Sequence, residues 1–278
     1  MLDAELADVA SGRGTLLLVA AHPDDDVIGA GALLARARDV RVVYITDGAP
    51  RDGQDAWARG FPDPRAYAAA RRREAEAALA RAAISVDRIV GLGISDQEAT
   101  FVLAPIAAAL AELIASLEPR LILTHPYEGG HPDHDAAAFA VRAAMDLAAT
   151  GRSRTVLGEF ASYHAGAHNG IRRLMFRNHR RCPETLLALD ESAAQAKADM
   201  LACHATQADL LAPFPRDRER FRRAPVYDFT RPPHAGRLLY ERAGAGAEWG
   251  IDGARWRAEA ASAAQRLRLG EALRATAT

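Results

Sequence analysis

Ala20-Ala21-His22-Pro23-Asp24-Asp25-Asp26 directly follows the apolar run Thr-Leu-Leu-Leu-Val at residues 15–19. A short apolar run that ends in proline and acidic residues is typical of a buried parallel strand, and open α/β sheets place their chemistry at the carboxyl ends of such strands. One imidazole and three carboxylates therefore arrive together at the mouth of a predicted sheet. Because a divalent metal neutralises carboxylates and binds neutral imidazole, we interpret His22, Asp24 and Asp25 as one half of a metal site.

Apolar strands and helices alternate along the following residues, which predicts an α/β fold with a mostly parallel sheet and helices on both faces. The expected strands are residues 41–45, 88–92, 121–123 and 155–162, and the expected helices are residues 27–38, 65–83, 101–117 and 136–149. Further on we expect a strand at 185–189, a helix at 192–211, an irregular segment with one short helix at 214–233, a strand at 238–241 and a tail helix at 254–273. We predict a single domain over residues 1–278, with a core at about 14–165 and a less regular C-terminal extension at 166–278.

The composition limits the kinds of partner that we expect. The 278-residue chain is 49% hydrophobic with a net charge of -1, which allows a large core and gives no net attraction to nucleic acid or anionic lipid. We therefore expect a small-molecule partner and no nucleic acid.

Cys182 and Cys203 are too few for a disulfide framework, and residues 1–14 do not resemble a signal peptide, so we expect a cytoplasmic protein. The apolar residues 99–117 are interrupted by Pro105 and Glu112, and we interpret them as a helix of the fold rather than a membrane span. The apolar stripe of the tail helix leaves a homo-oligomer open.

Two other chemistries are disfavoured by the sequence. Gly29-Ala30-Gly31 lacks the third glycine of a dinucleotide-binding fingerprint, because Leu34 occupies that position. Lys197 is the only lysine, so there is no Walker-loop lysine, and a Schiff-base mechanism would have to use Lys197 alone.

The second half of the predicted metal site follows the strand expected at residues 121–123, where the chain continues as Thr124-His125-Pro126-Tyr127-Glu128-Gly129-Gly130-His131-Pro132-Asp133-His134-Asp135. Pro132 suits the first position of a helix. His131 and His134 are three residues apart, so on a helix they share one face and can reach one centre. Either motif alone is common in loops. Both motifs, however, directly follow predicted parallel strands, whose carboxyl ends are expected to meet at one edge of the sheet. Two histidines with one carboxylate form a zinc-binding set that leaves a coordination position for water.

Residues 21–26 together with His131-Pro132-Asp133-His134 resemble the two motifs of the PIG-L or LmbE-like family of zinc-dependent N-deacetylases. Members of this family have a Rossmann-like fold and remove the N-acetyl group of N-acetylglucosaminyl conjugates and related amino sugars. The resemblance implies that His22, Asp25 and His134 are the zinc ligands. The same ligand types accept iron(II).

The resemblance also implies roles for residues around the metal. Asp24 would be the general base, and His131 would be the imidazolium that stabilises the oxyanion and protonates the leaving amine. Asp133 would orient His131 and keep it charged. Arg71 and Asp96 match positions that hold sugar hydroxyls or a neighbouring anionic group.

Two departures from the family pattern affect the expected site. Asp26 stands where the family usually has glutamate, so we expect it to be a shorter acid just behind the metal ligands. Some members carry a tyrosine two residues before the first histidine of the second motif, where this chain has Gly129. Tyr127 is the nearest substitute, and we include it among the predicted substrate contacts.

These observations predict a metal-dependent amide hydrolase that removes an acyl group, by resemblance acetyl, from an amino sugar or its conjugate. One alternative is a deacylase for a larger natural-product or thiol-sugar conjugate, which the long segments at residues 49–64 and 214–233 could accommodate. An alternative of another class is a metal-stabilised sugar-binding module without turnover. The presence of Asp24 as a candidate base disfavours that alternative.

Overall fold

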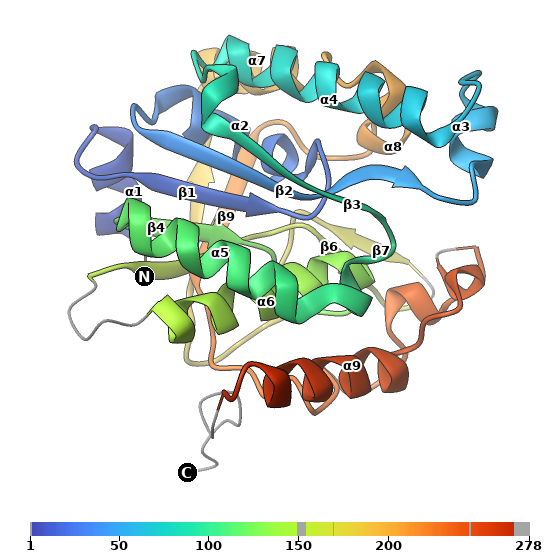
Figure 1. Ribbon diagram of the computed structural model, residues 1–278. Coiled ribbons are helices and arrows are strands. Elements are labelled where there is room, and N and C mark those ends of the chain that lie inside the picture. Colours follow the sequence, from blue (N-terminus) through green and yellow to red (C-terminus); the bar gives the residue numbers. More distant parts are fainter. Residues whose placement is uncertain (1, 149–153, 169, 245, 270–278) are drawn as a thin grey trace.

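The computed structural model of the protein describes residues 2–148, 154–168, 170–244 and 246–269. A seven-stranded sheet with the order β3-β2-β1-β4-β5-β9-β8 lies between two layers of helices (Figure 1). Five strands are parallel: β1 (Leu16–Ala20), β2 (Val40–Pro50), β3 (Ile89–Asp96), β4 (Leu121–Thr124) and β5 (Val156–Phe160). Antiparallel strands β9 (Arg218–Arg223) and β8 (Glu184–Ala188) extend the sheet, and β6 (Tyr163–Ala165) pairs separately with β7 (Ile171–Arg173).

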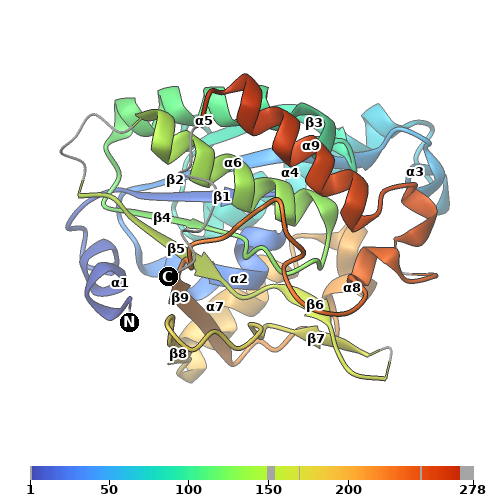
Figure 2. The ribbon, with the colours of Figure 1, turned by 90° about the horizontal axis from the view of Figure 1, so that it is seen from below.

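The two helical layers cover opposite faces of the sheet. One layer contains α2 (Asp25–Arg36), α4 (Pro64–Arg81) and α7 (Glu191–Leu201), and the other contains α5 (Leu103–Leu117), α6 (Pro132–Ala148) and α9 (Gly253–Arg266) (Figures 1 and 2). Strand β1 is buried on both sides, because Leu16 and Leu18 pack into one hydrophobic cluster while Leu17 and Val19 pack into the other. The shorter elements are α1 (Asp3–Ala10), α3 (Gln54–Ala58), α8 (Ala208–Leu211) and the 3₁₀ turns η1 (Val86–Arg88), η2 (Ala99–Val102), η3 (Ala205–Gln207), η4 (Leu239–Glu241) and η5 (Ala247–Trp249).

The predicted mostly parallel α/β sheet is confirmed, and its strand order explains where the two motifs meet. Strand β1 pairs with β2 on one side and with β4 on the other. The chain therefore reverses its direction of winding between β1 and β4, and the loops that leave their carboxyl ends diverge to form a crevice. Residues 21–26 and 125–134 lie in these two loops and at the starts of the helices that follow them.

The C-terminal part differs from the sequence prediction at three places. The helix expected at 192–211 ends at Leu201 and resumes only as η3 and α8, because Glu74 accepts hydrogen bonds from the backbone and hydroxyl of Thr206. Residues 218–223 were expected to be irregular but form β9, whose charged side chains Glu219 and Arg222 are buried with ionic partners. Residues 238–241 form a 3₁₀ turn instead of a strand, because Glu241 accepts the backbone N–H of Leu238.

Other expected elements are shifted or extended. Strand β2 continues to Pro50, and the loop expected at 49–64 contains α3. Helix α6 already begins at Pro132, which places His134 in its first turn and His131 directly before it. Residue 149 of the expected fourth helix and residues 270–273 of the expected tail helix lie outside the described residues.

Within the described residues, one helical segment, Ala99–Leu117, has the length and composition that a membrane crossing requires, with a hydropathy of 2.0. In the fold this segment comprises η2 and α5. It packs against α6 and α9 in the layer that covers one face of the sheet. This arrangement agrees with its interpretation as a helix of the fold.

Candidate active site

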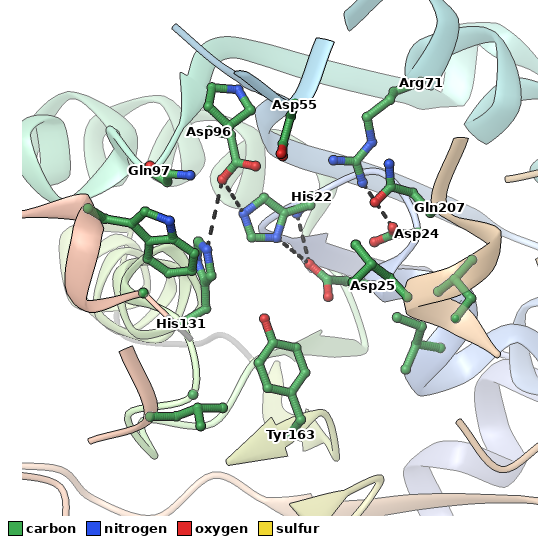
Figure 3. A pocket seen from close by; sticks show the side chains of 18 of the residues that line it. His22, Asp24, Asp25, Asp55, Arg71, Asp96, Gln97, His131, Tyr163 and Gln207 are labelled. Atoms are coloured by element: carbon green, nitrogen blue, oxygen red, sulfur yellow. Dashed lines mark hydrogen bonds and ion pairs between the residues drawn. The ribbon is translucent and has the colours of Figure 1, made fainter. Parts of the chain in front are cut away.

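His22 lies at the centre of a buried cluster at the carboxyl end of the sheet (Figure 3). Its Nδ1 is 3.0 Å from Asp25 Oδ2, and its Nε2 is 3.0 Å from Asp96 Oδ1 and 3.3 Å from Asp133 Oδ2. The other oxygen of Asp25 lies 3.3 Å from His134 Nε2. His22 and Asp133 are 111 positions apart in the sequence, so the fold brings the two predicted halves of the site together.

The charges and donor atoms of this cluster fit a divalent cation. Burying several carboxylates without a compensating cation costs several kcal/mol per charge. His134 Nδ1 lies 3.4 Å from Ser162 Oγ, and a hydrogen bond from Nδ1 to this hydroxyl leaves the lone pair on Nε2, which has no hydrogen-bond partner among the described residues. Ligand atoms of His22, His131 and His134 lie within 4.8 Å of one another. His22, Asp25 and His134 together offer the imidazole and carboxylate donors of a catalytic zinc or iron(II) site.

His125 joins this cluster although the sequence prediction did not include it. Its ring stacks on His134 with 3.9 Å between centroids, and its Nε2 accepts the backbone N–H of Ala21 at 3.1 Å. Burial lowers the pKa of His125 to about 3, so the ring is neutral. Because the backbone N–H already occupies its Nε2 lone pair, His125 supports the His134 ring rather than acting as a further ligand. Its position directly after β4, at the same edge of the sheet as the two motifs, is the feature of the sequence that could have predicted this.

Asp24 lies beside the cluster and contacts none of its imidazoles within hydrogen-bond distance. Its backbone φ of 140° is uncommon for a residue other than glycine. Arg71 donates to Asp24 Oδ2 at 2.9 Å, to the carbonyl of Pro23 at 2.9 Å and to the carbonyl of Gly48 at 2.6 Å. Burial raises the pKa of Asp24 to about 7, while Arg71 acts in the opposite direction. The observed contacts of Arg71 hold Asp24 in place, and its predicted contact with substrate stays a prediction.

His131 and Asp133 are arranged differently from the prediction. The carboxylate of Asp133 accepts hydrogen bonds from the backbone N–H groups of Gln97 and Ala99 and lies against His22, so it does not orient the His131 ring. Instead, the backbone N–H of Asp133 donates to His131 Nδ1 at 3.2 Å. Burial lowers the pKa of His131 well below its ordinary value. His131 is therefore neutral with its proton on Nε2.

The tyrosine that lines the cavity comes from a different segment than predicted. Tyr127 is 2% exposed, donates its hydroxyl to the carbonyl of Arg231 and does not line the cavity, so the prediction that it contacts substrate is wrong. Tyr163 on β6 lines the cavity, and its hydroxyl points toward His22 (Figure 3). A Cβ added at Gly130 would overlap the Tyr163 carbonyl oxygen, so glycine at this position allows β6 to lie against the second motif.

Asp26 and Asp96 are the remaining predicted residues. Asp26 is fully buried and accepts a hydrogen bond from the Tyr44 hydroxyl at 2.9 Å, and it contacts none of the predicted ligands. Burial raises the pKa of Asp26 to about 7. Asp96 ends β3 and lines the cavity. Burial would raise its pKa, but the facing His22 ring outweighs burial and lowers it.

A cavity of about 860 Å³ opens over the cluster, within the usual size range of small-molecule sites. The segment at residues 49–64 forms part of its wall through β2, α3 and the turn between them. The C-terminal extension supplies Gln207, Leu211, Phe214 and Trp249. The Trp249 ring lies 4.5 Å from the His131 ring, so this extension closes the site beside the second motif.

Lys197 does not reach this cavity. It is fully buried, and its Nζ donates to the carbonyl of Ile28 at 2.8 Å and to Glu219 Oε1 at 3.1 Å. Because Lys197 is the only lysine and does not line the cavity, Schiff-base chemistry is excluded at this site.

Comparisons with known proteins extend this description. Residues 17–145 match the family model described as PIG-L: GlcNAc-PI de-N-acetylase. A relative from Catenulispora acidiphila, a 1D-myo-inositol 2-acetamido-2-deoxy-alpha-D-glucopyranoside deacetylase, is 30% identical over 244 residues, which cover 74% of this chain and 78% of the relative.

Solved structures share the fold at lower identity. The A40926 pseudoaglycone deacetylase has a TM-score of 0.57 and 21% identity, and the match covers 75% of this chain and 96% of that one. The 4-carboxy-2-hydroxymuconate hydratase from Pseudomonas putida has a TM-score of 0.53 and 21% identity, and the match covers 71% and 81%. Because the fold also carries a hydratase, the reaction has to be inferred from the site itself.

Proposed function

Because this chain belongs to the PIG-L family of de-N-acetylases, we propose that it is a zinc-dependent hydrolase that removes the N-acetyl group from an amino sugar or an N-acetylglucosaminyl conjugate. The observation that supports this proposal best is the convergence of His22, Asp25 and His134. Beside them lies the Asp24 carboxylate, which Arg71 holds in place. Zinc held by three such ligands polarises a carbonyl group and lowers the pKa of water to about 7.

The side chains around these ligands can carry the proton transfers of amide hydrolysis. A new bond forms from the water oxygen to the acyl carbon, and the bond from that carbon to nitrogen breaks. Asp24 accepts the proton that the water loses and delivers it to the departing nitrogen, so the protons balance and the product is an amine. Arg71 fixes the position of the Asp24 carboxylate for both transfers.

Two donors are available for the negative charge that develops on the amide oxygen. Because His131 Nδ1 accepts a backbone N–H, its Nε2 carries the proton and can donate to this oxygen. The Tyr163 hydroxyl points toward the same cluster and is a second donor (Figure 3). Neutral donors suffice for this role, so His131 need not be the imidazolium that the family resemblance implies.

The test is to measure acetate and amine release from N-acetylglucosamine and its glycosides by the zinc-loaded protein, with zinc content determined for each variant. Asp24→Asn should retain zinc and lose at least about 100-fold in kcat, because a positioned base contributes at least that much. His131→Ala should also retain zinc and lose turnover, whereas His134→Ala should lose both. Equal zinc loss in the two histidine variants would show that the roles are wrongly assigned.

Sugar binding without acetate release by the unmodified protein would instead favour a binding module. Parallel loading with iron(II) compares the two metals.

A further inference from the structure

We propose that the cavity contains a groove for an acyl chain longer than acetyl, formed by Ile28, Leu211 and Phe214 and, at its outer end, by Leu210 and Ile171. We call these five residues the acyl groove. The proposal rests on the amide hydrolysis proposed above and adds the class of acyl group that the enzyme removes.

The cavity is lined by both polar and apolar side chains. The segments after β2 and β3 contribute Asp52, Gln54, Asp55, Gln97 and Glu98, whose side chains can hydrogen-bond to hydroxyl groups. An amide substrate of this enzyme carries a hydroxyl-rich sugar on its nitrogen and an acyl chain on its carbonyl carbon. The polar part of the lining suits the sugar, and the acyl groove suits the chain.

The acyl groove begins at the reacting centre. Ile28 lies three residues after Asp25 on α2, so both project from the same face of the helix, and Ile28 lines the cavity. Leu211 and Phe214 also line the cavity and belong to the same hydrophobic cluster as Ile28. The Phe214 ring lies 6.2 Å from the Tyr163 ring, and the Tyr163 ring lies 5.0 Å from the His134 ring. An acyl chain that leaves the carbonyl at the predicted metal therefore meets apolar side chains close to the predicted ligands.

The outer end of the acyl groove exposes two apolar side chains to solvent. Leu210 on α8 is 59% exposed and Ile171 on β7 is 38% exposed, and both line the same cavity. Exposed apolar side chains that gather around a cavity from separate segments mark a surface that a ligand covers. An acetyl group is too short to reach from the carbonyl carbon to this outer end, whereas a longer chain can cover it.

The test uses N-acylglucosamines with acetyl, butanoyl, hexanoyl and octanoyl groups. All four release the same amine, so one amine assay compares them. Burial of one methylene is worth up to about fourfold. In a groove partly open to solvent we expect about twofold per methylene, which over the four added methylenes gives roughly a 16-fold rise in kcat/KM from acetyl to hexanoyl. Binding of the product carboxylates, measured by calorimetry on the zinc-loaded protein, should show a similar gain from acetate to hexanoate.

Matched variants separate the acyl groove from general effects. Leu210→Asn should lower the hexanoyl-to-acetyl ratio of kcat/KM by about threefold, because it removes part of the apolar wall. Leu186→Asn is the control, because Leu186 is 53% exposed on β8, does not line the cavity and should leave the ratio unchanged. An unchanged ratio in Leu210→Asn would overturn the assignment.

Three further outcomes distinguish the acyl groove from other interpretations. A gain that appears only when an octyl group is placed on the sugar oxygen of N-acetylglucosamine would show that the apolar residues hold the aglycone, and would overturn the proposal. Hydrolysis of the acetyl substrate with a flat or falling acyl series would also overturn it, while the proposed function would stand. If no substrate is hydrolysed, the proposed function fails, and equal binding of acetate and hexanoate would then refute the acyl groove separately.

Discussion

Replacing Lys197 with methionine should destabilise the fold by about 3–5 kcal/mol, because it removes one partner of a buried ion pair. Helix α2 is interrupted at Ala30, where φ is -147° and ψ is 21°. The interruption frees backbone groups of α2, and the Lys197–Glu219 pair satisfies them. Lys197 donates to the carbonyl of Ile28 at 2.8 Å, and Glu219 accepts the backbone N–H of Ala32 at 2.7 Å.

The magnitude follows from the burial of both charges. Lys197 and Glu219 are each 0% exposed, and Nζ lies 3.1 Å from Oε1. Methionine preserves most of the lysine volume but leaves the Glu219 carboxylate buried without a cation. The double variant Lys197→Met/Glu219→Gln should cost less than the sum of the two single variants, because both charges leave together.

Urea unfolding at 25 °C, followed by circular dichroism, measures the free energy of unfolding of each variant. The control is Asp217→Asn, because Asp217 pairs with Arg218 at 2.8 Å but their side chains are 63% and 44% exposed. Such a surface pair should contribute less than about 1 kcal/mol. A Lys197→Met protein within 1 kcal/mol of the unmodified protein would refute the buried ion pair as described.

Three further predictions concern the site and its surroundings. Tyr163→Phe should lower kcat by about tenfold or more at unchanged zinc content, because one oxyanion donor is lost. The control Tyr127→Phe should leave kcat unchanged, because the Tyr127 hydroxyl donates to the Arg231 carbonyl instead. Equal effects of the two variants in steady-state assays would show that Tyr163 takes no part in the reaction. Gly130→Ala should lose activity, because the new methyl group displaces β6 from the second motif, and a crystal structure with β6 in its present position would contradict this reasoning. Burial lowers the pKa of His204 to about 3, below its usual 6.5. As the pH falls, His204 therefore becomes protonated in the unfolded chain before it does so in the folded protein. This difference should lower the free energy of unfolding by about 2 kcal/mol between pH 6.5 and pH 5. His204→Leu should abolish that part of the pH dependence in urea titrations, and an unchanged slope would show that His204 is not the cause.

The sequence predicted the parallel core because each of its strands is a short apolar run between helices. Strand β9 could not be found in this way, since its sequence Arg-Glu-Arg-Phe-Arg-Arg contains a single apolar residue. Its burial depends on distant partners, because Glu219 meets Lys197 and Arg222 meets Glu159. Local hydrophobic periodicity carries no information about such pairs.

The site was predictable to the level of motifs and not to the level of orientation. Both motifs end adjacent parallel strands, so their convergence follows from the topology. Asp133 faces His22 because its carboxylate accepts backbone N–H groups that follow β3. The position of the Tyr163 hydroxyl depends on β6, a strand that pairs outside the main sheet. These arrangements are set by tertiary contacts that a single sequence does not display.

The fold assigns the predicted metal ligands and the cavity walls to different kinds of element. The ligands follow β1 and β4, which pair with each other inside the sheet, whereas much of the cavity wall comes from the short elements α3, α8 and η5. Glu74 on α4 fixes one of these walls, because it accepts the backbone and hydroxyl hydrogens of Thr206 directly before Gln207. Changes in the short elements can therefore alter which substrate fits without moving the reacting groups. Glu74→Gln, which weakens this tether, should accordingly raise KM more than it lowers kcat. A loss confined to kcat would show that the wall and the reacting centre are not separable.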